Sequence, residues 1–226
     1  KIIQRISNDY LVDFRIKSKL NFLKFYIYNY YLSKVDILLC QNKYQSKKLL
    51  QKFSKNNISI IFNPFLLSDK VSIDLNRSYV AWVGIFQYQK NLKALLDIVD
   101  NMKDMKFKIA GKPLHTIDDQ TKESILELKK RNNVEFMGLL NRKNILQFLS
   151  HAYCLLNTSH YEGFSNTYLE SLSVGTPIVT RIETDPNNII KKNNLGISVE
   201  KYSEIPAAIL KVINKSNNIN NQNYVI

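Results

Sequence analysis

The segment TSHYEGFSNTYLESLSVGTPIVT, residues 158–180, decides how this chain folds. An apolar run ends near Thr158, and a loop containing Gly163 follows it. A helix then begins near Ser165 or Asn166, both of which are good N-cap residues. A glycine and a proline end that helix before a second apolar run starts. The segment therefore predicts a strand, a loop, a helix and a second strand, which is the repeating unit of a parallel α/β sheet.

The same alternation extends in both directions from this segment. Several of the apolar runs are continuous, as expected for parallel strands that are buried on both faces. Each strand-and-helix step takes about 20–25 residues, the size of a βαβ unit. The predicted strands are residues 79–84, 107–111, 134–138, 154–158, 177–180 and 196–199, and the predicted helices are 91–103, 120–132, 141–151, 166–174, 186–193 and 203–214. Six such steps predict an α/β fold with a Rossmann-like, doubly wound parallel sheet.

The N-terminal quarter has a shorter pattern of the same kind. The predicted elements there are a helix over 17–34, a strand over 36–40, a helix over 43–55 and a strand over 58–62. About two βα units are too few for an independent sheet, so we expect the end of a preceding Rossmann-like domain. The expected domains are residues 1–63 as the C-terminal part of that first domain, 64–78 as a linker, and 79–226 as the second domain.

The positive charge of the chain is concentrated near its N-terminus. The net charge is +13, and the first 62 residues hold 12 Lys and Arg against 3 Asp and Glu. The stretch 17–34 mixes Lys with Leu, Phe and Tyr at roughly helical spacing. Two interpretations stay open: a packed helix with a solvated Lys face, or a surface that rests on anionic lipid headgroups. No RNA-binding motif accompanies the charge, so we expect no nucleic-acid partner.

Composition excludes several protein classes. The 226 residues are 45% hydrophobic, which argues against global disorder and fibrous folds. Cys40 and Cys154 are too few for a disulfide framework or a zinc site, and they favour a reducing compartment. No apolar run approaches the roughly 20 residues that a membrane span needs. The chain starts at Lys1 without an initiator Met, so we expect a fragment of a longer protein.

The loop and helix of the opening segment have the chemistry of a ligand site. The first turn of a helix has free backbone N–H groups and a partial positive charge, and such a turn binds phosphate. Glu162 lies just before the helix, and Glu170 lies one turn inside it. Carboxylates are poor phosphate ligands but good acceptors for hydroxyl groups, such as those of a sugar and a ribose.

Two further strand ends support that interpretation. In VGIFQYQKN (83–91) the strand ends at Gly84 and Lys90 opens the next helix, which places a cation where diphosphate charge would lie. In VEFMGLLNRKNI (134–145), Gly138 permits close backbone approach. Each residue alone has an ordinary structural explanation, as a solvated Glu, a surface Lys or a strand-end Gly. Their common position at strand carboxyl ends favours one site.

These motifs resemble a known enzyme family. EGFSNTYLE has the form E-x7-E, and EGFSNTYLESLSVGTPIV resembles the donor-site signature of the retaining GT-B glycosyltransferases of family four, the glycosyl transferases group 1. VGIFQYQKNL is similar to the family's G-R-x(4)-K-N/G segment, and VEFMGLL to its V-x-F-x-G-x-V strand. DILLCQNKYQSKKLLQKF with IIFNPF resembles the end of the family's N-terminal domain. The resemblance runs from about residue 17 to 213.

The resemblance implies roles for individual residues. Residues 79–226 would bind the nucleotide-sugar donor, with Lys90 stabilising the diphosphate and Glu162 contacting the donor sugar as the catalytic pair. Glu170 would hydrogen-bond the ribose. The implied donor-binding set is Gly84, Glu162, Gly163, Phe164, Ser165, Asn166, Thr167 and Glu170, and the residues expected near the base are Met137, Gly138, Leu139 and Leu140. No metal and no cofactor are implied, and a UDP-sugar is favoured over a GDP-sugar.

The implied activity is transfer of a hexosyl group, with retention, to a glycan or lipid-linked acceptor. We expect a bacterial enzyme of surface polysaccharide synthesis, such as O-antigen, lipopolysaccharide or capsule. It would be cytoplasmic, with peripheral contact to the inner face of the cell membrane as the alternative raised by residues 17–34. Because most of the acceptor domain is absent, the chain alone would bind donor with little turnover.

One departure from the family pattern keeps other functions open. Ile85 stands where the family usually has Arg, so one diphosphate cation is missing or is supplied by Lys112 or Arg142. A catalytically degenerate nucleotide-sugar-binding module is therefore an alternative to the enzyme. A basic protein that associates with membrane or nucleic acid through residues 17–34 is another.

Overall fold

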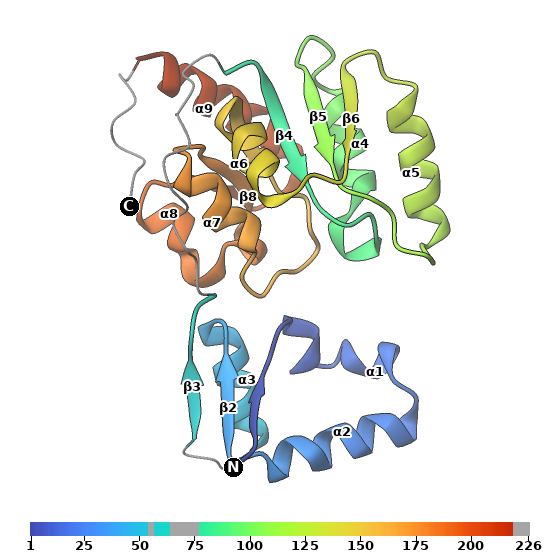
Figure 1. The fold of residues 1–226 in the computed structure, drawn as a ribbon, viewed down its shortest axis with the longest axis vertical. Helices are drawn as coiled ribbons and strands as arrows, with labels where there is room; N and C mark the ends of the chain where they lie inside the picture. Colours follow the sequence, from blue (N-terminus) through green and yellow to red (C-terminus); the bar gives the residue numbers. More distant parts are fainter. Residues whose placement is uncertain (54–56, 64–76, 219–226) are drawn as a thin grey trace. The chain divides into compact units, whose positions relative to one another are not determined.

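The computed structural model describes residues 1–53, 57–63 and 77–218 (Figure 1). The chain groups into two compact units. The smaller unit comprises residues 1–64 together with 161–165, and the larger unit comprises 65–160 and 166–226. Most of the predicted linker, residues 64–76, lies outside the described residues.

The larger unit is built on a parallel sheet of six strands. The strands are β4 (Tyr79–Val83), β5 (Phe107–Ala110), β6 (Val134–Gly138), β7 (Ala152–Leu156), β8 (Ile178–Arg181) and β9 (Gly196–Val199). Their order across the sheet is β6-β5-β4-β7-β8-β9, and every neighbouring pair is parallel. The predicted Rossmann-like class is confirmed. The strand order reverses between β4 and β7, the position at which open α/β sheets bind ligands.

Helices cover both faces of this sheet (Figure 1). They are α4 (Leu92–Asp100), α5 (Asp119–Lys129), α6 (Arg142–Ser150), α7 (Asn166–Ser173), α8 (Ile189–Lys192) and α9 (Ile205–Asn218), with short 3-10 turns η2 (Tyr88–Lys90), η3 (Ile182–Thr184), η4 (Pro186–Asn188) and η5 (Tyr202–Glu204). One buried cluster contains side chains of α4, α5 and α9, and another contains side chains of α6, α7 and α8. Two separate cores are what a doubly wound sheet requires.

Strand β4 shows why continuous apolar runs form the centre of the sheet. Val80 and Trp82 belong to the first of these cores, whereas Tyr79 and Ala81 belong to the second. Successive strand residues point to opposite faces, so a strand that is covered on both sides must be apolar throughout. Strand β4 therefore has no polar face, and only the residues that follow its carboxyl end can contact a ligand.

The prediction of one helix over 186–193 is wrong, because the α-helix there is shorter. Pro186–Asn188 forms the short turn η4, and α8 has only four residues. Asn187 and Asn188 have φ values of 58° and 57°, which lie in the left-handed region. Asn tolerates that region better than most residues, so the backbone leaves the helical path there. The strand predicted at 154–158 also lies two residues earlier, as β7.

The smaller unit has a parallel sheet of three strands. These are β1 (Ile3–Arg5), β2 (Ile37–Cys40) and β3 (Ile58–Ile60), in the order β1-β2-β3, and its helical elements are η1 (Asp9–Leu11), α1 (Ile16–Lys19), α2 (Phe22–Lys34) and α3 (Lys43–Lys52). The expectation of only two βα units is corrected, because β1 adds a strand. Its three residues, IQR, contain no apolar run that the sequence pattern could detect.

The single helix predicted over 17–34 is also corrected. The chain breaks between α1 and α2, where Leu20 and Asn21 have extended backbone conformations. The Asn21 side chain accepts a hydrogen bond of 2.9 Å from the Lys24 backbone N–H, so Asn21 caps the start of α2. None of the described helices is both long enough and apolar enough to cross a membrane.

Candidate functional site

Two loops of the larger unit are hydrogen-bonded to each other at the point where the strand order reverses. The indole N–H of Trp82, on β4, donates to the hydroxyl of Thr158 at 2.9 Å. That hydroxyl donates to the backbone carbonyl of Lys90 at 2.8 Å. The His160 backbone N–H donates to the Gln89 carbonyl, also at 2.8 Å. The loop after β4 and the loop after β7 are therefore held in one framework at the carboxyl edge of the sheet, where open α/β sheets generally bind ligands.

Gly84 and Lys90, both predicted site residues, lie together in this framework. A Cβ built on Gly84 would lie 3.3 Å from both Cγ and Cδ of Lys90. The alkyl chain of Lys90 thus passes over the glycine that ends β4. Asn91 follows with a φ of 48°, and its side chain accepts a hydrogen bond from the Ala94 N–H at the start of α4. The sequence therefore fixes the turn that presents Lys90.

His160 lies beside the same turn, although the sequence assigned it no role. Its ring stacks on Tyr88 with 4.8 Å between centroids. Burial lowers the pKa of His160, and the positive charge of Arg181 lowers it further. Its Nε2 is buried without a hydrogen-bond partner among the described residues. Burial and the neighbouring positive charge therefore both favour the neutral form of the imidazole.

Glu170 occupies a half-buried position on α7. Burial raises the pKa of its carboxyl group, and the positive charge of Arg142 partly offsets that effect. Arg142 begins α6, which packs beside α7. When it is ionised, a carboxylate in such a setting is a strong acceptor for a hydroxyl donor. Asn166, at the start of α7, is exposed, and Thr167 is half-buried.

Residues 161–165, which include Glu162, belong to the smaller unit. The Asn42 side-chain N–H donates to the carbonyl of Gly163 at 3.0 Å, and that of Asn63 donates to the carbonyl of Phe164 at 2.9 Å. A Cβ on Gly163 would collide with the terminal amide of Gln41. The loop backbone is thus held by side-chain amides, and a side chain at Gly163 would force the buried Gln41 amide to shift.

Aromatic contacts hold the two ends of this loop. The guanidinium of Arg15 lies 4.6 Å from the centroid of the Tyr161 ring, and the Tyr10 ring lies 6.1 Å from it. At the other end, the rings of Phe62 and Phe164 are 5.6 Å apart. Glu162 is half-buried between these contacts, and Ser165 is buried. The loop is therefore a well-packed part of its unit.

The residues predicted to lie near the base occupy the end of β6 and the loop after it. Gly138 has a φ of +67°, and its carbonyl accepts the Gly111 N–H at 2.8 Å. Leu139 is 68% exposed, whereas Met137 and Leu140 pack against the core. Leu139 is thus the apolar side chain of this group that is available to a planar ligand.

Several cations lie near the carboxyl edge of the larger sheet. Ile85 is exposed and supplies no charge. Lys112 follows β5 and is exposed. Arg181 ends β8, where it pairs with Glu183 at 2.8 Å and lies 4.5 Å from the centroid of the Tyr202 ring. Sequence reasoning missed Arg181, although it directly follows the predicted strand 177–180. Lys90 follows β4, Lys112 follows β5 and Arg181 ends β8, so three strands have a basic side chain at or just after their carboxyl end.

The doubly wound sheet and its basic edge define a Rossmann-like protein with a site suited to a phosphorylated ligand. Comparison with known proteins then gives the family. The profile described as "Glycosyl transferases group 1" matches residues 66–224. The chain belongs to this glycosyltransferase family, which confirms the resemblance seen in its motifs.

Individual relatives are similar to this chain over most of its length. An uncharacterised glycosyltransferase, MJ1059 of Methanocaldococcus jannaschii, is 25% identical over 72% of the chain and 44% of its own length. The alpha-monoglucosyldiacylglycerol synthase of Streptococcus pneumoniae is 25% identical over 65% of the chain and 34% of its own length. The amylovoran biosynthesis glycosyltransferase AmsD of Erwinia amylovora is 24% identical, with coverages of 84% and 55%. The chain thus spans about a third to a half of these relatives.

Solved structures confirm the GT-B fold. A point mutant of S. aureus TarM, in complex with fondaparinux, alpha-GlcNAc-glycerol and UDP, gives a TM-score of 0.77 at 18% identity, covering 95% of this chain and 44% of TarM. Anabaena Alr3699/HepE in complex with UDP-glucose gives 0.80 at 14% identity, covering 98% of this chain and 65% of HepE. At these identities the likeness concerns the fold alone.

Proposed function

We propose that this glycosyltransferase moves a hexosyl group from a nucleotide-diphosphate sugar to a glycan or lipid-linked acceptor, with retention at the anomeric carbon. The observation that carries the proposal is the position of Lys90, which hydrogen bonds hold where the strand order of the sheet reverses. The named relatives support the acceptor class, since one makes a glucosyl lipid and another acts in amylovoran synthesis. We assign the activity to bacterial surface polysaccharide synthesis.

Lys90 acts on the leaving group. When the bond between the anomeric carbon and the diphosphate oxygen breaks, negative charge grows on that oxygen. A fixed ammonium group stabilises that charge more in the transition state than in the ground state, and this difference speeds the reaction. The contact between the Lys90 alkyl chain and Gly84 restricts where the ammonium can reach. Lys112, which is exposed after β5, supplies the additional positive charge that Ile85 does not.

The E-x7-E motif binds the rest of the donor. Glu170, when ionised, accepts hydrogen bonds from the ribose hydroxyls, and the first turn of α7 offers backbone N–H groups to phosphate. Glu162 accepts from hydroxyls of the donor sugar. The backbone of residues 163–165, with Asn166 and Thr167, holds the sugar and diphosphate. The base lies against residues 137–140.

We favour a UDP-sugar as the donor, without a metal or other cofactor. Structures of similar fold contain UDP or UDP-glucose. A nucleotide-sugar donor also fits a cytoplasmic location. The alternative, a degenerate binding module, is favoured by one observation, which is the uncharged Ile85 at the position of the family's usual Arg.

Calorimetric titration with UDP, GDP, ADP and their sugar conjugates tests the donor site. We expect saturable binding of UDP conjugates that Lys90→Ala weakens by about tenfold or more, since a charged contact is lost. Lys93→Ala is the matched control, because Lys93 lies on the next turn and pairs with Asp97. Absence of binding to every nucleotide would contradict the proposal.

Product analysis separates enzyme from binding module. The protein is incubated with the nucleotide sugar that it binds and with lipid-linked or glycan acceptors. The anomeric configuration of any product is then determined by NMR. Retained configuration supports the enzyme. Donor binding without transfer to any acceptor supports the degenerate module.

A further inference from the structure

Two consecutive carbonyl groups of the loop 161–165 accept hydrogen bonds from asparagine side chains. Asn42 donates to the Gly163 carbonyl at 3.0 Å, and Asn63 donates to the Phe164 carbonyl at 2.9 Å. Asn42 follows β2 and Asn63 follows β3, and these two strands are parallel neighbours. Both asparagines and the loop belong to the smaller unit. The carboxyl edge of its sheet therefore fixes the direction of two adjacent peptide groups.

The direction of a carbonyl group also sets the direction of the N–H group that follows it. A trans peptide is planar, and its C=O and N–H bonds point in opposite directions. None of the described peptide bonds is cis. Because the two loop carbonyls point toward the asparagines, the N–H groups of Phe164 and Ser165 point away from them. Within the described part of the chain, neither of these N–H groups donates to a backbone carbonyl. Two neighbouring backbone donors are thus available to a ligand.

The orientation of the Asn42 side chain is fixed by three hydrogen bonds. Its oxygen accepts the Gln45 backbone N–H at 2.8 Å, which caps the start of α3. Its nitrogen donates to an oxygen of Asp9 at 3.0 Å and to the Gly163 carbonyl. The amide has one oxygen and two N–H bonds, so these contacts use all of its polar groups. Turning the amide over would place its N–H groups against a donor and its oxygen against two acceptors.

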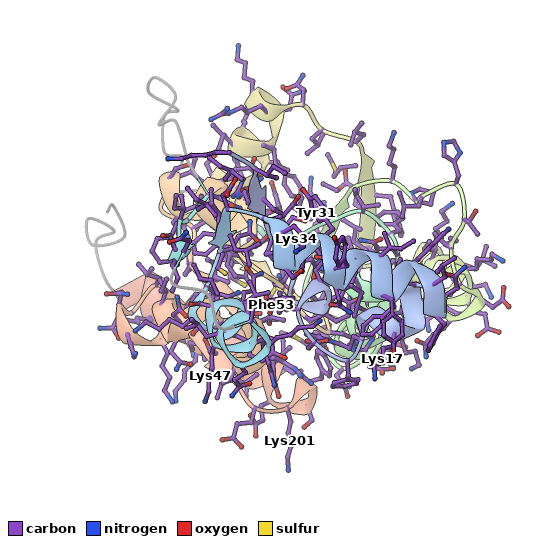
Figure 2. The ribbon with its side chains drawn as sticks, turned by 90° about the horizontal axis from the view of Figure 1, so that it is seen from below. Lys17, Tyr31, Lys34, Lys47, Phe53 and Lys201 are labelled. Carbon is purple, nitrogen blue, oxygen red and sulfur yellow. The ribbon has the colours of Figure 1, made fainter. Side chains whose placement is uncertain are left out.

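Buried side chains behind Asn42 hold it in this orientation. The same oxygen of Asp9 also accepts the side-chain N–H of Gln45 at 2.9 Å, and the Gln45 side-chain oxygen accepts the Gln41 backbone N–H at 2.8 Å. Gln45 lies in the first turn of α3, the helix that contains the labelled Lys47 in Figure 2. Asp9, Gln41, Asn42 and Gln45 are all buried. A buried network whose members are hydrogen-bonded is rigid, so it can fix the loop.

We propose that Asn42 and Asn63 are positioning residues for the donor sugar, because they orient the N–H groups of Phe164 and Ser165 that donate to its hydroxyl oxygens. The inference rests on the proposed function, which places the loop backbone against the sugar. Donors that are already oriented bind a hydroxyl without the cost of ordering the loop. Lys90 and the first turn of α7 hold the diphosphate in that function, so the two asparagines should act on the sugar.

The variant Asn42→Ser separates this role from folding. Serine still caps α3, because its hydroxyl can accept the Gln45 backbone N–H, but it lacks the amide N–H that reaches the Gly163 carbonyl. Asn21→Ser is the matched control. Asn21 caps α2 of the same unit by accepting the Lys24 backbone N–H at 2.9 Å, and none of the proposed ligand contacts involves α2.

Calorimetric titration of the full chain with UDP, UDP-glucose, UDP-galactose and UDP-N-acetylglucosamine measures the effect. The measured quantity is the affinity for the UDP-hexose that the native chain binds best, divided by the affinity for UDP. We expect Asn42→Ser and Asn63→Ala each to lower this ratio by about tenfold, because the loop donors lose their orientation. Asn21→Ser should leave the ratio unchanged. A general loss of stability would weaken both ligands together and would not change the ratio.

The outcomes separate this inference from the proposed function. An unchanged ratio in either folded variant overturns the role of that asparagine, and an equal decrease in Asn21→Ser overturns both roles. In each case, UDP-hexose binding that Lys90→Ala weakens leaves the proposed function standing. If the native chain binds none of the UDP-hexoses, the proposed function fails and the inference fails with it. Circular dichroism checks that each variant folds, and if Asn42→Ser does not, Asn63→Ala decides the outcome.

Discussion

At Gly163 the absence of a side chain allows the loop to pack closely against Gln41 and Gln45. An alanine Cβ there would collide with the Gln41 amide and lie 3.1 Å from Nε2 of Gln45. We therefore expect Gly163→Ala to destabilise the protein by about 1–3 kcal/mol, the usual cost of overpacking. Denaturant unfolding measures the loss.

A double-mutant cycle identifies the cause of that loss. Gln41→Ala removes the amide that the new methyl group would strike. If packing is the reason, Gly163→Ala should cost much less in the Gln41→Ala background than in the native one. Equal costs in the two backgrounds would show that the collision does not determine the effect.

The raised pKa of Glu170 predicts how donor binding depends on pH. The ionised carboxylate is a stronger acceptor for hydroxyl donors than the protonated carboxyl, so donor affinity should fall as pH decreases through its folded-state pKa. Because burial raises that pKa above its ordinary value of 4.5, the loss begins at a higher pH than for an exposed Glu. Titrations with UDP over a series of decreasing pH values should show this step.

The variant Glu170→Gln provides the comparison. It should bind UDP more weakly, by about 1–3 kcal/mol for the lost charged hydrogen bonds, and should lack the step at low pH. Burial also means that the folded protein prefers the protonated carboxyl, so this residue's contribution to stability decreases as pH rises from its unfolded pKa to its folded pKa. An unchanged pH step in the glutamine variant would assign the step to another group.

Individual site residues differed in how well the sequence revealed them. Gly84 and Lys90 lie six residues apart in one turn, and local sequence dictates that turn. The neighbourhoods of Thr158, His160 and Arg181 depend on strands that are distant in the chain, so no local pattern shows them. The functional roles of all these residues remain predictions.

At the scale of elements, Thr158 links the loop after β4 to the end of β7. Thr158→Val removes the acceptor of Trp82 Nε1 and the donor to the Lys90 carbonyl. We expect a stability loss of about 1–3 kcal/mol from unsatisfied buried groups, together with weaker donor binding because Lys90 loses its backbone restraint. Thermal unfolding and titration with UDP measure the two effects.

Thr176 provides a control of the same type. Its buried hydroxyl donates to the Leu149 carbonyl at 2.7 Å, and none of the proposed ligand-contact residues takes part in this bond. Thr176→Val should therefore reduce stability by a similar amount and leave donor affinity unchanged. Equal loss of affinity in the two variants would mean that Thr158 has no particular role in placing Lys90.

The inner strands of the larger sheet show why some elements were easy to predict. Strands β4, β7 and β8 are mostly buried, so their apolar runs are continuous and easy to detect. Strand β1 has only three residues and no such run. The break between α1 and α2 depends on a single N-cap, Asn21, within a long helical pattern. Short elements and breaks depend on contacts that periodicity does not record.

At the scale of the whole molecule, each unit has its own core and one buried cysteine. Cys40 lies in the core of the smaller unit, and Cys154 lies in a core of the larger unit. Burial raises the pKa of these thiols to about 11 and about 12. Thiolate is the reactive form, so neither should react with a thiol reagent near neutral pH while its unit is folded.

Thiol labelling therefore reports the unfolding of each unit separately. The sheet of the smaller unit has three short strands, and small cores are marginally stable. We expect Cys40 to become reactive at a lower denaturant concentration than Cys154, as measured by pulse alkylation and mass spectrometry of the two peptides. Single-cysteine variants, Cys40→Ala and Cys154→Ala, establish each transition alone. If both cysteines instead become reactive at the same denaturant concentration, the two units unfold as one cooperative structure. Each thiol would then become accessible only when both units open.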